Sequence, residues 1–315
     1  MSEKQKLSRR RVKKKSKKRL RKRIIFFLLI PVLIVFLGLA GYGTYLYTKA
    51  DEVLSPSYED DGREKSPLRD AKIDPTIDNV SVLIIGVDEN KHRANNGENR
   101  YRSDALMVAT FNKDEKSIKL LSIPRDSYVY IPERGYEDKI THAHYFGGHQ
   151  STIETVENLL DIPIDYYVKL NFHAFVDVVD ALGGITAEVP YELKESNSMD
   201  KRDAIHLMPG VQELDGEEAL ALARTRKLDS DIERGKRQQE ILKSVIKKAA
   251  SLDSVLSYDK ILEAVGDNMT TNMTFSDMKT FISYGTSGLN LDIETQSLEG
   301  YDYQPAGIYY YQLDP

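Results

Sequence analysis

The sequence predicts an α/β domain with helices on both faces of a mixed sheet, joined at its N-terminus to a membrane anchor. Residues Val80 to Val87 form a nearly continuous β-branched run, which is typical of a strand buried on both faces. Strand-like and helix-like segments then alternate through most of the remaining chain, as expected for helices packed on a sheet. With 315 residues, the chain is long enough for one sizeable domain plus appendages.

The N-terminus carries a basic block followed by an uncharged apolar stretch. Residues 1–23 contain fourteen Lys and Arg and one acid, whereas the rest of the chain has a net charge of −18. Residues 24–47 carry no charge and, as a helix, would span a hydrocarbon core of about 30 Å. Because basic flanks stay in the cytoplasm, we expect a single-pass type II protein of the cell membrane with an extracellular domain. A cleaved signal peptide ending near Gly38-Leu39-Ala40 and nucleic-acid binding by the basic block are the alternatives.

Residues 48–78 connect the anchor to the domain. They are polar and interrupted by three prolines, which predicts an extracellular stalk. The chain has no cysteine, so the exported domain must rely on its core rather than on disulfides. The composition also excludes a cysteine nucleophile and thiolate metal sites.

Further strands are predicted from short apolar runs at Ala105–Phe111, Ile118–Ile123 and Ile185–Val189. A capping box at Ser151-Thr152-Ile153-Glu154 predicts the start of the first helix. Other helices are expected over Phe172–Leu182, Glu217–Ala223, Asp231 to about Ala250 with Asp231 as the cap, and Phe275–Tyr284. The tyrosine-rich C-terminus suggests one more strand.

Charged residues gather where the first two strands meet their loops. Asp88 ends the first strand and Asp104 precedes the second, with Arg102 beside it. Ligands of open α/β sheets bind at strand ends, and two carboxylates there suit Mg²⁺, or Mn²⁺, shared with a substrate phosphate. The alternative is that each aspartate caps a turn.

Arginines follow other predicted elements. Arg224 and Arg226 would share one face of an extended segment, where they repel each other unless an anion lies between them; otherwise both point into solvent. Arg125 follows the third strand and either contacts the same anion or pairs with Asp126.

In the long helix after Asp231, the face predicted to be buried extends toward the helix N-terminus through Gln238 and Arg234. A buried Arg234 needs a partner, which is either an inward Asp or a bound phosphate. Lys139 is a further candidate phosphate contact, and His142 is interpreted as a structural hydrogen bonder rather than a base. The chain contains no G-x-S-x-G, Walker A or H-E-x-x-H motif.

In combination, these motifs resemble those of the LytR-CpsA-Psr proteins of Gram-positive bacteria, and among them wall teichoic acid ligases of the TagU type. The resemblance covers Val80 to Ala250 and rests on Gly86-Val87-Asp88, Arg102-Ser103-Asp104, Pro124-Arg125-Asp126, Lys139-Ile140-Thr141-His142-Ala143, Ala223-Arg224-Thr225-Arg226-Lys227, and Arg234 with Arg237-Gln238-Gln239. It implies a three-layer α-β-α catalytic domain over residues 79–315. Family members often have an Arg soon after the residue that corresponds to Asp88. This chain departs from that pattern, because its next Arg is Arg93.

The resemblance implies a phosphotransferase that attaches an anionic cell-wall glycopolymer, carried on undecaprenyl pyrophosphate, to the C6 hydroxyl of N-acetylmuramic acid in peptidoglycan. The lipid tail would occupy an apolar tunnel, and the pyrophosphate would lie among arginines with Mg²⁺. The implied catalytic residues are Asp104, Arg102 and Arg125, with Asp104 favoured over His142 as base, and the metal ligands are Asp88 and Asp104. The implied pyrophosphate ligands are Arg102, Arg125, Lys139, Arg224, Arg226, Arg234 and Gln238. A pyrophosphatase and a non-catalytic polymer-binding or lipid-binding module are the alternatives; no nucleic-acid partner is expected.

Overall fold

The computed structural model describes residues 30–76, 78–88, 101–226, 230–249, 258–266, 268–286 and 292–315. The chain divides into two compact units, Met1–Ala50 and Asp51–Pro315. The basic block at 1–23, the first six residues of the expected membrane helix, Arg93 and Lys227 lie outside the described residues. Helix α2 covers Ile30–Leu54. Among the described residues, none of the helices combines the length and apolar character required to cross a membrane.

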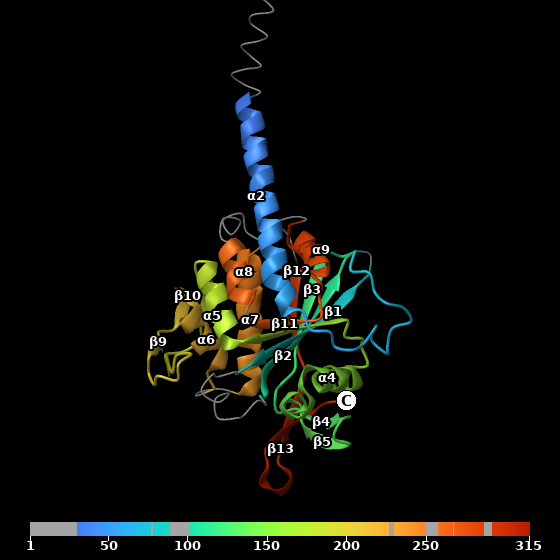
Figure 1. The fold of residues 1–315 in the computed structure, drawn as a ribbon. Helices are drawn as coiled ribbons and strands as arrows, with labels where there is room; N and C mark the ends of the chain where they lie inside the picture. The colour runs from blue at the N-terminus through green and yellow to red at the C-terminus, as the bar shows by residue number, and fades with distance from the viewer. Residues whose placement is uncertain are drawn as a thin grey trace, which may run out of the picture. The chain divides into compact units, whose positions relative to one another are not determined.

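The larger unit is built on a six-stranded mixed sheet with the strand order β11-β6-β1-β2-β3-β12 (Figure 1). The central strand β1 (Val80–Val87) pairs antiparallel with β2 (Ser103–Asn112) and parallel with β6 (Tyr166–Asn171). Strand β3 (Ser117–Ser122) is antiparallel to β2. The outer strands are β12 (Asp292–Ser297), parallel to β3, and β11 (Met269–Thr271), antiparallel to β6. The predicted mixed sheet is confirmed, although the sequence analysis predicted neither β6 nor the outer strands.

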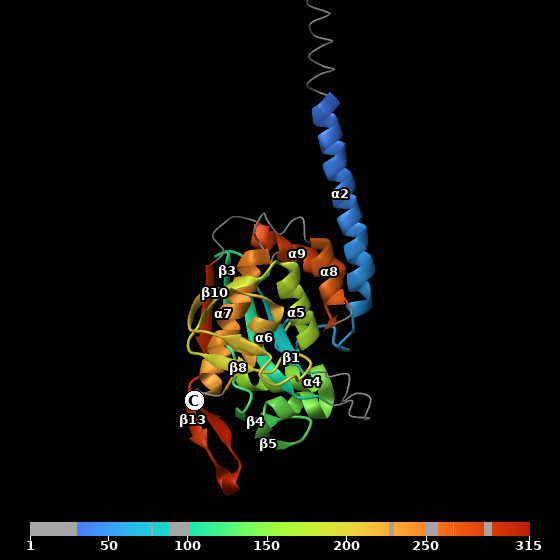
Figure 2. The same cartoon turned by 90° about the vertical axis from the view of Figure 1, so that its left-hand side faces the viewer.

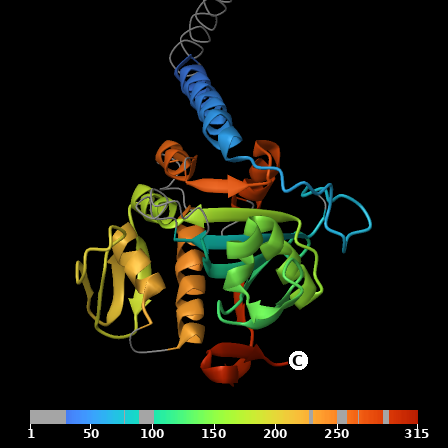
Figure 3. The same ribbon diagram turned by 60° about the horizontal axis from the view of Figure 1, so that its bottom comes forward.

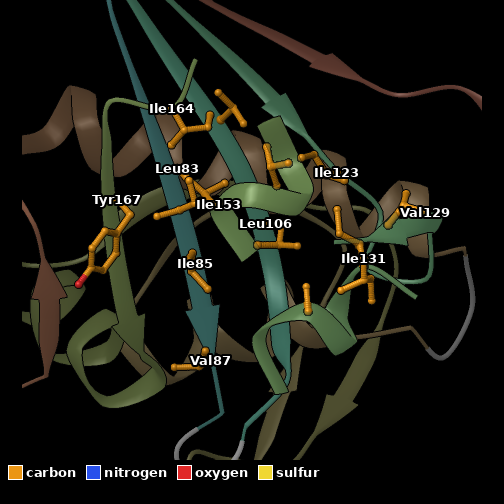
Figure 4. Packing of buried hydrophobic residues seen from close by; sticks show 14 residues of the cluster. Leu83, Ile85, Val87, Leu106, Ile123, Val129, Ile131, Ile153, Ile164 and Tyr167 are labelled. Atoms are coloured by element: carbon orange, nitrogen blue, oxygen red, sulfur yellow. The ribbon is translucent and has the colours of Figure 1, made fainter. Parts of the chain in front are cut away.

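One face of β1 forms a close-packed core with α4 (Thr141–Leu160). Leu83, Ile85 and Val87 are fully buried on this face together with Leu106 of β2, as Figure 4 shows. Helix α4 begins at Thr141 and consists of two helical segments that meet at a kink at Gly147 and Gly148, which have non-helical dihedral angles. A helical segment therefore does begin close to Ser151, but the capping box predicted there is wrong. The Ser151 hydroxyl is buried without a hydrogen bond, so it caps nothing.

Helices α5 (Phe172–Ala181), α6 (Gly216–Arg224) and α7 (Asp231–Ala249) lie on the opposite face of the sheet, where Phe281 of α9 (Phe275–Thr286) also packs against Val80 and Val82. Helix α5 contacts β6, α7 contacts β3 and β12, and α6 lies beside α7, as seen in Figure 3. The predicted cap of α7 is wrong: the Ser230 hydroxyl accepts from the Glu233 N–H at 3.3 Å, whereas Asp231 pairs with Arg234. Helices therefore cover both faces of the sheet.

The remaining elements lie around this framework. Paired strands are β4 (Tyr128–Ile131) with β5 (Tyr136–Lys139), β7 (Ile185–Val189) with β10 (Gly210–Leu214), β8 (Leu193–Glu195) with β9 (Ile205–Leu207), and β13 (Gly300–Tyr303) with β14 (Tyr310–Leu313). Short helices are η2 (Ser55–Ser57), α8 (Tyr258–Gly266), α9 (Phe275–Thr286) and η4 (Pro305–Gly307). Figure 2 shows the β13–β14 hairpin projecting beside the C-terminus.

Part of the segment expected to be a stalk lies against the folded domain. Arg63 Nη1 is 3.1 Å from Glu157 Oε2, and the Ser66 hydroxyl donates to the other oxygen of the same carboxylate at 2.6 Å. Arg69 Nη2 lies 2.6 Å from Asp165 Oδ2. Because Glu157 and Asp165 have little exposure, these contacts attach residues 63–69 to the end of α4 and the start of β6.

Candidate functional site

A cavity of about 360 Å³ lies between the sheet and the helices α5, α6 and α7. Its floor includes Gly86 of β1 and its cross-strand partner Ala105 of β2, where a Cβ on Gly86 would lie 3.0 Å from the Ala105 Cβ. These two small residues leave space that larger side chains would fill. The apolar lining is completed by Ile84, Met107, Leu170, Phe172, Phe175, Leu220, Ala223, Ile241 and Leu242.

Asp104 enters the cavity because of an irregularity in β2. Gly86 is opposite Ala105 and Val87 is opposite Ser103, so Asp104 is the extra residue of a β-bulge. A bulge redirects side chains, which explains why the adjacent residues Asp104 and Ala105 both line the cavity. The bulge could not be predicted from the sequence pattern, which placed the start of the strand at Ala105.

Arg125 forms an ion pair with Asp104 inside the cavity. The alternative pairing of Arg125 with Asp126 is wrong, because Asp126 Oδ1 instead lies 2.9 Å from Lys139 Nζ. Arg125 Nε is buried and has no hydrogen-bond acceptor among the described residues. The guanidinium therefore keeps one buried donor available for a ligand oxygen.

Arg234 is 5% exposed and pairs with Asp231 at 2.6 Å, so the inward Asp partner considered from the sequence is present. Burial raises the pKa of Asp231, and the positive charge of Arg234 opposes that rise. Burial likewise lowers the pKa of Arg234, with Arg226 and Arg125 adding repulsion. Apart from the ion pair, neither carboxylate oxygen of Asp231 nor Arg234 Nε has a hydrogen-bond partner in the part of the chain that the structure describes. This cluster is therefore incompletely satisfied and has an excess of positive charge.

Arg224 ends α6, Thr225 after it has an extended backbone, and both Arg224 and Arg226 line the cavity, so the alternative that both point into solvent is wrong. The Arg224 guanidinium lies 5.0 Å from the centre of the Phe172 ring. Gln238 lines the cavity too, and its amide donates to the Ala223 carbonyl at 3.1 Å. This bond fixes the end of α6 against α7.

Arg237, to which the sequence gave no separate role, makes two hydrogen bonds that support the site. Arg237 donates to the carbonyls of Leu222 and Thr225, which orients the segment that carries Arg224 and Arg226. The only signal was the polar run Arg237-Gln238-Gln239 on a helix next to its buried stripe. No sequence signal pointed to Glu195 at the end of β8, or to Ser196 and Asp200 in the β8–β9 connection, which also line the cavity.

Other predicted site residues lie outside the cavity lining in the described part of the chain. Arg102 is exposed, and Asp88 follows β1 on the same alternation as Ile84 and Gly86. Lys139 is held by Asp126. His142 Nδ1 lies 2.8 Å from Asp138 Oδ2, in agreement with its interpretation as a structural hydrogen bonder.

The donor set of the site fits a divalent cation only in the presence of phosphate. In the described residues, no group of three or more His, Asp or Glu side chains could hold a metal. Asp104, already paired with Arg125, lines the cavity, whereas Asp88 follows the adjacent strand β1 and lies outside the lining. Mg²⁺ commonly binds through one or two carboxylates, with substrate phosphates and water completing its shell.

Known proteins are similar to this chain in both sequence and fold. A match to the LytR_cpsA_psr family covers residues 44–315. The polyisoprenyl-teichoic acid–peptidoglycan teichoic acid transferase TagT of Bacillus subtilis is 44% identical over 276 residues, which are 86% of this chain and 84% of TagT. The transferase TagU of Halalkalibacterium halodurans is 41% identical over 276 residues, 86% of each protein.

Two solved structures have a similar fold. A structure of TagT bound to LI-WTA has a TM-score of 0.67 and 42% identity, covering 80% of this chain and 91% of that chain. A structure of YwtF (TagT) with bound octaprenyl pyrophosphate lipid has a TM-score of 0.63 and 40% identity, covering 80% of this chain and 90% of that chain.

Proposed function

The chain belongs to the LytR-CpsA-Psr family, and we propose that it transfers an anionic cell-wall glycopolymer, such as a wall teichoic acid, from undecaprenyl pyrophosphate to peptidoglycan. The observation that carries this proposal is the combination, in one cavity, of an apolar lining with Arg125, Arg224, Arg226 and Arg234. Similar proteins are teichoic acid transferases, and a similar structure holds octaprenyl pyrophosphate.

The cavity accounts for both parts of such a lipid. A polyprenyl chain is apolar and fits between the Gly86–Ala105 floor and the side chains of Phe175 and Ile241. The pyrophosphate is acceptor-rich and doubly charged or more, so it matches the unsatisfied guanidinium donors of Arg125 and Arg234. It would also relieve the repulsion among the arginines.

In the proposed reaction, the C6 hydroxyl oxygen of N-acetylmuramic acid attacks the phosphorus that bears the glycopolymer. A new phosphorus–oxygen bond forms, and the bond from that phosphorus to the bridging oxygen breaks, releasing undecaprenyl phosphate. The arginines stabilise charge on the transferred phosphoryl group and on the departing phosphate. Arg102, although exposed, and Lys139 lie on segments that border this site and are assigned to the outer phosphate contacts.

The hydroxyl proton needs an acceptor, and Asp104 is the better candidate. Its carboxylate lines the cavity, whereas His142 is outside the described cavity lining and its Nδ1 is engaged by Asp138. Arg125 holds Asp104 in position. Asp88 and Asp104 would hold Mg²⁺ together with the phosphate, and the ion would supply further neutralisation of the phosphate charge.

We also propose that residues 24–47 anchor the protein in the cell membrane, with residues 1–23 in the cytoplasm and the catalytic domain outside. The support is the +13 charge of the first 23 residues directly before an uncharged stretch. This placement brings the cavity to the side of the membrane where peptidoglycan lies.

A reconstituted reaction with a lipid-linked polymer, Mg²⁺ and uncrosslinked glycan strands tests the function. We expect polymer linked to the strands through a phosphodiester, with undecaprenyl phosphate released in equal amount. Release of the carrier at the same rate without strands, and no linked product with them, would identify a pyrophosphatase. An Asp104→Asn variant should lose transfer while still binding the donor, and full transfer by that variant would point to another base.

A further inference from the structure

Tyrosines lie together on two neighbouring hairpins, β4–β5 and β13–β14. The Tyr128 ring centre lies 4.7 Å from that of Tyr310 and 5.5 Å from that of Tyr303. Tyr303 is opposite Tyr310 in the hairpin register, and Tyr301 lies on the same face two residues earlier. Tyr130 shares the face of β4 that carries Tyr128. These five residues, Tyr130, Tyr128, Tyr310, Tyr303 and Tyr301, are called the tyrosine row.

The tyrosine row adjoins the candidate site. The Tyr311 N–H of β14 donates to the Asp126 carbonyl at 2.8 Å, which fastens the hairpin to the residue next to Arg125. Lys139 Nζ lies 5.7 Å from the centre of the Tyr310 ring and 2.9 Å from Asp126 Oδ1. A molecule lying along the row would therefore reach the segment that holds the Arg125–Asp104 pair.

The row has the chemistry of a carbohydrate-binding surface. Tyr301 is 57% exposed, Tyr130 45% and Tyr303 36%. Such rings offer flat apolar faces that can pack against the C–H faces of sugars, and each carries a hydroxyl that can bind sugar hydroxyls. Exposed aromatic groups that lie together are typical of binding surfaces.

The charges beside the row favour an uncharged, hydroxyl-rich ligand over a membrane surface. Glu137 interacts with Tyr128, and Asp302 accepts a hydrogen bond from the Tyr309 hydroxyl at 3.0 Å. These carboxylates can bind sugar hydroxyls but are repelled by anionic lipid head groups. The two cations nearby, Lys139 and Arg134, already lie over tyrosine rings.

We propose that the tyrosine row is the acceptor subsite, where the glycan backbone of peptidoglycan binds and presents its hydroxyl to the phosphorus of the donor. This proposal rests on the proposed function, because it names the surface for the second substrate of that reaction. The row positions the acceptor and takes no part in breaking bonds.

The test compares a Tyr130→Ala/Tyr301→Ala double variant with the full-length protein. These two rings are the most exposed of the row, so their loss should leave the fold intact, as checked by thermal unfolding. The Tyr130→Phe/Tyr301→Phe variant keeps both rings. A matched control is Tyr58→Ala, which removes a tyrosine of similar exposure, 44%, that lies by its backbone against Thr271 instead.

We expect the double alanine variant to bind uncrosslinked glycan strands at least about tenfold more weakly, with KM for the strands rising to match and octaprenyl pyrophosphate binding unchanged. The phenylalanine variant should retain most of the affinity, and Tyr58→Ala all of it. Unchanged strand binding and KM in the alanine variant would overturn the subsite while leaving the proposed function standing. Loss of binding to phosphatidylglycerol vesicles, with strand binding intact, would make the row a membrane surface. If the wild type binds strands through the row but forms no linked product, the subsite stands and the proposed function fails.

Discussion

Replacing Arg234 by Ala should destabilise the domain in a way that depends on pH. Arg234 and Asp231 are a buried pair, with side chains 7% and 13% exposed. Removing one member of such a pair leaves the other charge buried and typically costs about 3–5 kcal/mol. Among the described residues, neither Asp231 oxygen has a hydrogen bond apart from this ion pair, so only the charges of Arg125 and Arg226 would offset the loss of Arg234. We therefore expect a loss toward the lower end of this range at pH 8.

The pH dependence follows from the pKa of Asp231. Burial already raises this pKa, and the nearest charge that opposes the rise is that of Arg234. Without Arg234, the folded protein binds a proton at Asp231 more readily than the unfolded chain does. Its stability relative to the wild type therefore recovers as the pH falls, by about 1.4 kcal/mol for each unit by which the folded-state pKa of Asp231 in the variant exceeds that in the wild type.

Urea unfolding of the wild type and Arg234→Ala between pH 8 and pH 5 measures this difference. Adding Asp231→Asn to Arg234→Ala should remove both the pH dependence and much of the loss, because the unpaired carboxylate is gone. As a comparison, Arg224→Ala removes a cation from the face of Phe172 and should cost only about 1 kcal/mol. A loss for Arg234→Ala that is the same at every pH, and that Asp231→Asn does not relieve, would refute this reasoning.

Three further outcomes are expected. Arg224→Ala and Arg226→Ala should each weaken polyprenyl pyrophosphate binding at least about tenfold with little effect on folding. Lys at either position should restore only part of the affinity because it lacks the bidentate fork of Arg. Calorimetry that finds unchanged affinity would remove both arginines from the site. Calorimetry should also detect little Mg²⁺ binding without a pyrophosphate and clear binding with one, whereas tight binding to the free protein would contradict the shared site. Ala105→Leu should fill the cavity floor and weaken binding of octaprenyl pyrophosphate but not of inorganic pyrophosphate; equal effects on both would place the chain elsewhere.

The sequence pattern predicted the buried strands and helices well, because a continuous apolar run or an apolar stripe at helical spacing is compatible with few other structures. Strands over Val80–Val87 and Ile185–Val189 and the extent of α7 agree with the structure. Helix N-caps were predicted less well, because Ser151 and Asp231 are residue types that commonly cap helices but neither caps one here. The short outer strands depend on pairing partners far away in the chain, which local patterns do not encode.

The charged members of the site could be predicted by residue type but not by partner. Arg234 and Gln238 follow from helical periodicity, and the extended turn at Thr225 brings Arg224 and Arg226 to the cavity. The Arg125–Asp104 pair depends on a β-bulge that no alternation pattern reveals. The hollow above Gly86 likewise depends on how helices pack across the sheet.

A crystal structure of this chain with octaprenyl pyrophosphate and Mg²⁺ would test the central claim most directly. We expect the prenyl chain in the cavity between the sheet and α5, α6 and α7, and phosphate oxygens within hydrogen-bond distance of Arg125, Arg224 and Arg226. The metal should contact phosphate as well as protein carboxylate. A pyrophosphate held away from these arginines, with the cavity empty or filled by side chains, would contradict the account.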